Sequence, residues 1–210
     1  MSKQPIPAQT RRNEIRDRAS QRRRQQNMML AVAGAIVVTL LGLVIFLNIR
    51  STLPVAGEES FSSQGNAHID DGAASPIVYN STPPSSGPHY GGLANWAIYD
   101  TPIRYEQLIH NLEDGGVIVY YQCPEGCADD VAKMAEVVQP YLNAGRHLVM
   151  LPNDPTFMGD NGAPAHKDMG AKIALVAWGK VLKMESVDPD LMRRFIDKYV
   201  GIDHHVAGQG

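Results

Sequence analysis

The sequence predicts a mixed α/β domain carried by one N-terminal transmembrane helix. Three observations lead to this fold class: an uncharged apolar run at residues 28–47, short apolar runs rich in β-branched residues after residue 116, and amphipathic segments between them. A helical crossover implies a parallel strand pair, and a Gly-Lys turn implies an antiparallel hairpin. We therefore expect one domain with a mixed sheet, in the pattern of a thioredoxin-like core, and a long Pro/Gly-rich irregular segment before it.

The apolar run holds twenty residues, and Thr39 is the polar side chain within it. As a helix this run is roughly 30 Å long, which is enough to cross a bilayer core. A secretory signal would have a shorter apolar core followed by a small-residue cleavage site, whereas this run continues into Asn48 and Arg50. We expect an uncleaved transmembrane helix over residues 28–49, with the lipid bilayer of the cell membrane as its partner.

Charge on either side of this helix predicts the orientation of the chain. Residues 1–27 hold eight Lys/Arg against two acids, whereas residues 51–210 hold ten Lys/Arg against twenty Asp/Glu. The positive-inside rule keeps the basic tail, 1–27, in the cytoplasm and places the rest outside. An acidic domain argues against nucleic acid as a partner. Composition further predicts a flexible stalk at 50–75, an extracytoplasmic domain at 76–201 and a loose tail at 202–210.

Hydrophobic spacing predicts the regular elements of the domain. Helices are expected at 103–112, at 129–143 and after Asp188-Pro189, and strands at 117–121, 147–151, 172–178 and 181–184.

The two cysteines, Cys123 and Cys127, lie between a predicted buried strand and the start of a predicted helix. Backbone N–H groups at a helix N-terminus favour a thiolate, and disulfides persist outside the cytoplasm. Three alternatives stay open: a structural disulfide, metal ligation and dithiol redox chemistry. The CxxxC loop is also similar to the copper-binding loop of the Sco copper-delivery family, which projects from a single membrane anchor.

Three further segments resemble an uncharacterised prokaryotic family, the domain of unknown function numbered thirty-one-oh-five. They are PPSSGPH ending at His89, HNLEDGG starting at His110, and ALVAWG at 174–179. Members of that family typically show PPTSGPH, HNLEHGG and TAWG in these places. The resemblance covers roughly residues 76–201 and implies no established activity.

The candidate metal ligands are His89, His110 and Asp114. Asp114 stands where the family has the second histidine of HNLEHGG. A carboxylate in that place makes the site less suited to Cu(I) and more tolerant of Zn or Mn. The cysteines emerge at the opposite end of the strand starting at Val117, about 15 Å away, so the two sites are expected to be separate. Alternatively, His89 and His110 are buried hydrogen-bonding residues that hold the Pro/Gly segment on the strand.

These features predict a membrane-anchored extracytoplasmic accessory protein that binds a transition metal. The metal would be copper or zinc, with copper favoured. The protein would deliver this metal to a larger membrane protein complex or help to assemble that complex. Two other classes remain: a structural subunit or protein-interaction module without metal, and a thiol-disulfide oxidoreductase. The sequence lacks GxSxG, HExxH, P-loop and GxGxxG motifs, which disfavours a hydrolase or nucleotide enzyme. We therefore expect a protein that is not an enzyme and has no catalytic residues.

Overall fold

The computed structural model describes residues 8–124, 126–159 and 162–205. The chain divides into two compact units, Met1–Leu53 and Pro54–Gly210. Each unit has its own structure and is treated separately below.

The first unit is a single continuous helix, α1 (Ala8–Thr52). It contains the apolar run and, within the described residues, also the basic segment before that run. The part from Ser20 to Phe46 is long and apolar enough to cross a membrane, by length and composition. Residues 28–47 of this helix carry no charge, which suits a segment surrounded by lipid.

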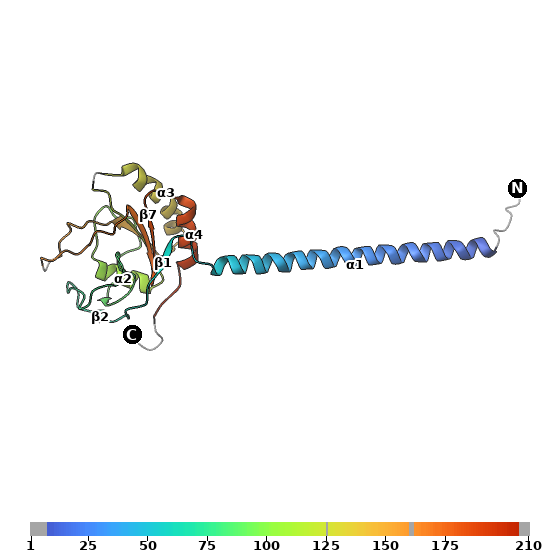
Figure 1. Cartoon of the computed structure of the whole chain (residues 1–210), viewed down its shortest axis with the longest axis horizontal. Helices are drawn as coiled ribbons and strands as arrows, with labels where there is room; N and C mark the ends of the chain where they lie inside the picture. Colours follow the sequence, from blue (N-terminus) through green and yellow to red (C-terminus); the bar gives the residue numbers. More distant parts are fainter. Residues whose placement is uncertain (1–7, 125, 160–161, 206–210) are drawn as a thin grey trace. The chain divides into compact units, whose positions relative to one another are not determined.

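The second unit combines seven short strands with three helices in the described part of the chain (Figure 1). In chain order these elements are β1 (Glu58–Ser60), β2 (His68–Ile69), β3 (His89–Tyr90), α2 (Tyr105–Glu113), β4 (Val117–Tyr121), α3 (Ala128–Asn143), β5 (Leu148–Pro152), β6 (Ile173–Ala177), β7 (Lys180–Met184) and α4 (Pro189–Tyr199).

The main sheet is mixed, as the sequence predicts, with strand order β1-β7-β6-β4-β5. The crossover through α3 makes β4 and β5 parallel, while β6 is antiparallel to both β4 and β7. Gly179 turns the chain between β6 and β7 with a φ of 69°, a conformation that glycine adopts without a steric penalty. A second, two-stranded sheet pairs β2 with β3 in parallel.

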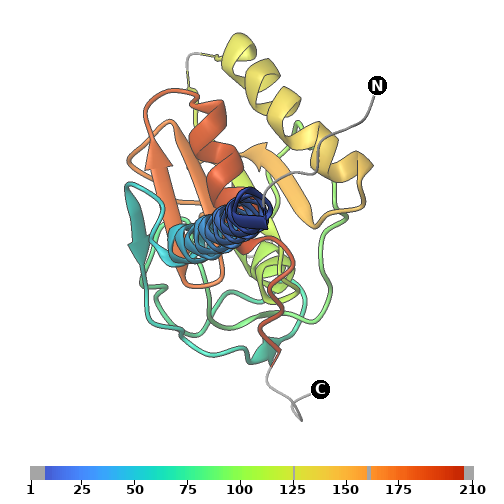
Figure 2. The same cartoon turned by 90° about the vertical axis from the view of Figure 1, so that its right-hand side faces the viewer.

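Helices cover both faces of the main sheet, with α3 and α4 on one side and α2 on the other (Figure 2). Alternate side chains of β4 divide between the two cores: Val117 and Val119 pack with α3 and α4, whereas Ile118 and Tyr120 pack with α2. A strand that is buried on both faces has to be apolar throughout, which explains the VIVYY sequence. Helix α2 is thereby fixed on the sheet at the start of β4.

The flexible stalk expected at 50–75 is wrong from Pro54 onward, because these residues belong to the folded unit. Val55 is buried in the core, β1 pairs with β7, and β2 pairs with β3. The pairing partner of β1 lies about 120 residues further along the chain, so local composition carries no sign of it.

The loose tail expected at 202–210 also differs in its first residues. The backbone N–H of His204 donates to the carbonyl of Glu113 over 2.9 Å, and that of Ile202 donates to Tyr199. Residues 206–210 lie outside the described part of the chain.

Candidate functional site

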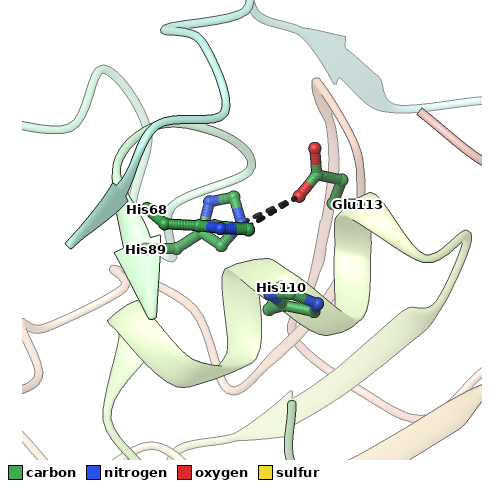
Figure 3. A group of neighbouring side chains, drawn as sticks. All are labelled: His68, His89, His110 and Glu113. Carbon is green, nitrogen blue, oxygen red and sulfur yellow. Dashed lines mark hydrogen bonds and ion pairs between the residues drawn. The ribbon is translucent and has the colours of Figure 1, made fainter. Parts of the chain in front are cut away.

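Two strands and one helix bring four potential metal ligands together. The parallel register of β2 and β3 places His68 opposite His89. His110 and Glu113 lie three residues apart on α2, hence on one face of that helix. The ligand atoms of these four side chains all lie within 4.8 Å of one another. Figure 3 shows His68 and His89 reaching from neighbouring strands toward Glu113, with His110 on the same helix as the carboxylate.

Most of this cluster is shielded from solvent. His89 is fully buried, Glu113 is 1% exposed and His110 is 8% exposed, whereas half of the His68 side chain is accessible. The rings of His68 and His110 stack with centroids 5.3 Å apart, and the His89 ring meets both edge-on. A buried carboxylate among three imidazoles is stabilised by a positive partner, because an isolated charge is costly in such a place.

Hydrogen bonds determine which nitrogen of His89 faces the carboxylate. Its Nδ1 lies 2.8 Å from the carbonyl oxygen of Gly87, and its Nε2 lies 2.9 Å from Oε2 of Glu113. A carbonyl only accepts, so Nδ1 carries a proton. Burial lowers the pKa of His89, while the hydrogen bond to Gly87 and the charge of Glu113 act in the opposite direction. The contact between Nε2 and Oε2 is favourable when a proton or a metal ion is shared between the two groups.

The ring of His110 is also fixed by its Nδ1. This nitrogen donates to the carbonyl oxygen of Tyr90 over 2.8 Å, so Nε2 is directed away from β3. Oε1 of Glu113 accepts a hydrogen bond of 2.8 Å from the Asn66 side chain, and this orients Oε2 toward the histidines. Backbone carbonyls and amides that fix imidazoles and carboxylates in this way are typical of the surroundings of metal ligands.

The sequence-predicted ligands His89, His110 and Asp114 divide between two groups. Asp114 is not part of the buried cluster. It belongs to a second group with His110 and His205, whose ligand atoms also lie within 4.8 Å of one another. Asp114 Oδ1 lies 3.9 Å from His110 Nε2 and 3.5 Å from His205 Nε2.

The predicted ligand set did not include His68, Glu113 or His205. His68 falls in the expected stalk and His205 in the expected loose tail, and both reach the site through pairing with distant segments. For Glu113 a signal was present, since it lies in the HNLEDGG segment three residues after His110.

The turn after α2 explains the two glycines of that segment. Gly115 has a φ of 75°, and its carbonyl accepts a hydrogen bond from Gly201. A Cβ on Gly116 would lie 2.4 Å from the carbonyl oxygen of Asn111 and 2.7 Å from the Trp96 ring. The chain can therefore pass directly from α2 into β4 while holding Glu113 in place.

The cysteines lie beyond the far end of β4 from the histidines. Cys123 and Cys127 are joined as a disulfide with an S–S distance of 2.04 Å, just before α3. Next to them is an open hollow of about 620 Å³ that Lys133 and Lys172 also line. Because they lie at opposite ends of β4, the disulfide and the histidine cluster are two separate sites.

Comparisons with known proteins give one match. The model of a family described as "Protein of unknown function (DUF3105)" matches residues 71–207, which include His89, His110, Glu113, Asp114 and His205, while His68 lies just before them. No curated protein and no solved structure matches the chain, so the likeness of the CxxxC loop to Sco proteins gains no support. Since the matched range is more than half of the chain, this protein belongs to the DUF3105 family of unknown function.

Proposed function

We propose that this protein is a membrane-tethered extracytoplasmic accessory protein that binds one divalent transition metal ion through His68, His89, His110 and Glu113. The observation that supports it most is the orientation of the rings. Two buried histidines each donate Nδ1–H to a backbone carbonyl, and Nε2 of His89 lies 2.9 Å from the buried carboxylate of Glu113. A metal ion bound by these Nε2 atoms and by the carboxylate would balance the negative charge of Glu113.

The donor set favours a borderline metal. Three imidazoles and a carboxylate suit Zn(II) and Cu(II), and the Irving–Williams order makes Cu(II) the tighter of the two. In a tetrahedral site with bonds of about 2.1 Å, ligand atoms are roughly 3.4 Å apart. The four ligand atoms are within 4.8 Å of one another, so binding needs only a modest contraction. His68, the exposed member on the short strand β2, is the ligand best able to close on the ion.

The tether and the compartment are part of the same proposal. The apolar segment of α1 would anchor the chain in the membrane, and the basic residues before it would hold that end in the cytoplasm. The Cys123–Cys127 disulfide suits an oxidising compartment. The strand order β5-β4-β6-β7, with α3 as the crossover, supports a thioredoxin-like core. Copper or zinc held there could be delivered to a larger membrane complex during its assembly.

Metal titration of the full chain in detergent micelles tests the proposal. The protein is purified without a histidine tag, stripped with a chelator and titrated with Cu(II) or Zn(II) under calorimetry. We expect one equivalent to bind at micromolar or lower concentration. A wild-type chain that binds no metal would mean that the histidines are structural and that the protein is a structural subunit or interaction module.

The sharpest variant is Glu113→Gln. Its amide oxygen can still accept from Asn66, while its N–H₂ can donate to the Nε2 lone pair of His89. The metal-free domain should therefore remain folded, but affinity should fall by at least about 100-fold, because the anionic ligand is gone. His68→Ala, at a half-exposed position, should weaken binding as well. The matched control is Cys123→Ser with Cys127→Ser, which should leave the stoichiometry at one.

A second candidate is thiol-disulfide exchange at Cys123 and Cys127. It is favoured by the position of the disulfide beside an open hollow at the start of α3, where a partner thiolate could attack and a leaving thiolate would be stabilised. A reduction potential below about −300 mV would identify an inert structural bridge instead.

A further inference from the structure

The second group, His110, Asp114 and His205, lies between the buried cluster and solvent. His110 is common to both groups. The exposed fraction of the side chains rises outward, from 1% at Glu113 to 11% at His110, 24% at Asp114 and 41% at His205. His205 Nε2 is 3.5 Å from Asp114 Oδ1 and 3.8 Å from Glu113 Oε2, so the outer group adjoins the inner one.

The C-terminal segment is held at this position by several specific contacts. The backbone of His204 donates to the Glu113 carbonyl, and its ring stacks on Trp178 with centroids 5.8 Å apart. The His205 Nδ1 lies 2.7 Å from Asp203 Oδ1. A carboxylate accepts this hydrogen bond, so Nδ1 donates it, and Nε2 lies on the side of Asp114. The hydrogen bond to Asp203 and the neighbouring carboxylates raise the pKa of His205, so its Nε2 releases a proton when it binds a metal ion.

A single nitrogen connects the two groups. The Nδ1 of His110 donates a hydrogen bond to the Tyr90 carbonyl, so only Nε2 of His110 is available to a metal ion. One imidazole nitrogen binds one ion. The inner and outer groups therefore compete for His110 and cannot both use it at once.

We propose that His110, Asp114 and His205 form a loading site, from which a divalent metal ion passes to the inner site through their shared ligand His110. This inference rests on the proposed function. The ion would first exchange water for Asp114 and His205 at the exposed group. While His110 keeps hold of it, Asp114 and His205 would then be replaced by His89, His68 and Glu113. The metal keeps its charge throughout, and no oxidant or reductant takes part.

The rate of zinc uptake tests this proposal. Metal-free full-length chain in detergent micelles is mixed with Zn(II) held by a weak chromophoric chelator, and transfer is followed by stopped flow. His205→Ala and Asp114→Asn should each slow uptake by roughly tenfold or more. Both variants should still bind one equivalent at equilibrium, because the inner ligands are unchanged.

His204→Ala is the matched control. His204 is the sequence neighbour of His205, but its ring stacks on Trp178 and its contact with Glu113 is made by the backbone, which alanine retains. Its uptake rate should equal that of the wild type. If His204→Ala slows uptake as much as His205→Ala, the effect comes from the general position of the tail, and the loading site is wrong.

The outcomes separate the two proposals. Wild-type uptake of one equivalent with an unchanged rate in His205→Ala would overturn the loading site and leave the proposed function standing. Loss of the bound equivalent in His205→Ala would make His205 a permanent ligand, and two equivalents in the wild type would mean two independent ions; either result overturns the shared-ligand transfer. No uptake by the wild type would reject the metal-binding function itself.

Discussion

At the scale of single residues, the geometry of the site also depends on residues that are not themselves proposed metal ligands. The Asn111 side chain accepts a hydrogen bond from the backbone N–H of Ala94 and donates one to the backbone carbonyl of Ala94. These two bonds attach α2 to the segment before it. Gly116 lies against the Asn111 carbonyl and the Trp96 ring with no space for a methyl group. The orientation of α2, and with it the direction of His110 and Glu113, is fixed by this close contact.

Gly116→Ala should therefore destabilise the domain, by about 1–3 kcal/mol, because the added Cβ overlaps the backbone carbonyl of Asn111 and the Trp96 ring. Urea unfolding of the full chain in micelles, followed by tryptophan fluorescence, measures the change. Gly91→Ala is the control, since Gly91 is exposed and has nothing within 4 Å of the added Cβ. Its effect should stay within about 0.5 kcal/mol. Equal midpoints for the two variants would show that the turn is not tightly packed.

At the scale of elements, the edge strand β1 connects the start of the folded unit to its last helix. The Glu58 side chain is 2% exposed; its Oε1 accepts a hydrogen bond of 2.7 Å from the Tyr199 hydroxyl and lies 3.4 Å from Lys198 Nζ. Its Oε2 accepts from the backbone N–H of Val55. A three-residue strand would contribute little by its ladder alone, so these side-chain contacts account for much of its attachment.

Replacing Glu58 should consequently loosen this end of the domain. We expect Glu58→Ala to lower the free energy of unfolding by about 1.5–3 kcal/mol, because it removes charged hydrogen bonds and leaves the Tyr199 hydroxyl without its acceptor. Glu59→Ala, at the neighbouring exposed position of the same strand, should change it by less than about 0.5 kcal/mol. Thermal or urea unfolding compares the two. A loss that is the same for both would mean that β1 contributes only its backbone pairing.

The helices and strands also show which parts of the fold can be predicted from the sequence. The four longer strands and the three helices of the domain can be predicted from apolar runs and from the spacing of apolar residues. Each of these elements is long enough to show the repeat that is typical of its type. Strands β1, β2 and β3 have two or three residues and exist only through partners elsewhere in the chain. His89 and His110 stand out through their motifs, whereas His68 and His205 become site residues by long-range pairing, which no local pattern encodes.

At the scale of the whole molecule, we expect the basic segment and the apolar run to hold the folded unit, and the site within it, on the extracytoplasmic side of the membrane. We expect α1 to remain in the membrane after alkaline carbonate extraction, and a reporter enzyme fused after Gly210 to be active only on the extracytoplasmic side. Replacing Arg22, Arg23 and Arg24 with Glu should reduce that activity, since the charge bias that sets orientation is reversed. Cytoplasmic activity of the unmodified fusion would contradict this topology and remove the oxidising compartment from the proposal.

The fastening of His204 to Glu113 has a practical consequence for anyone who extends this chain. The His205 ring lies 6.3 Å from the His110 ring, and each further residue of a fully extended chain adds at most about 3.6 Å. A histidine purification tag attached a few residues after His205 would therefore hold its own imidazoles within reach of His110, where they would compete for incoming ions. Affinity tags for metal work are better attached before α1 than after His205.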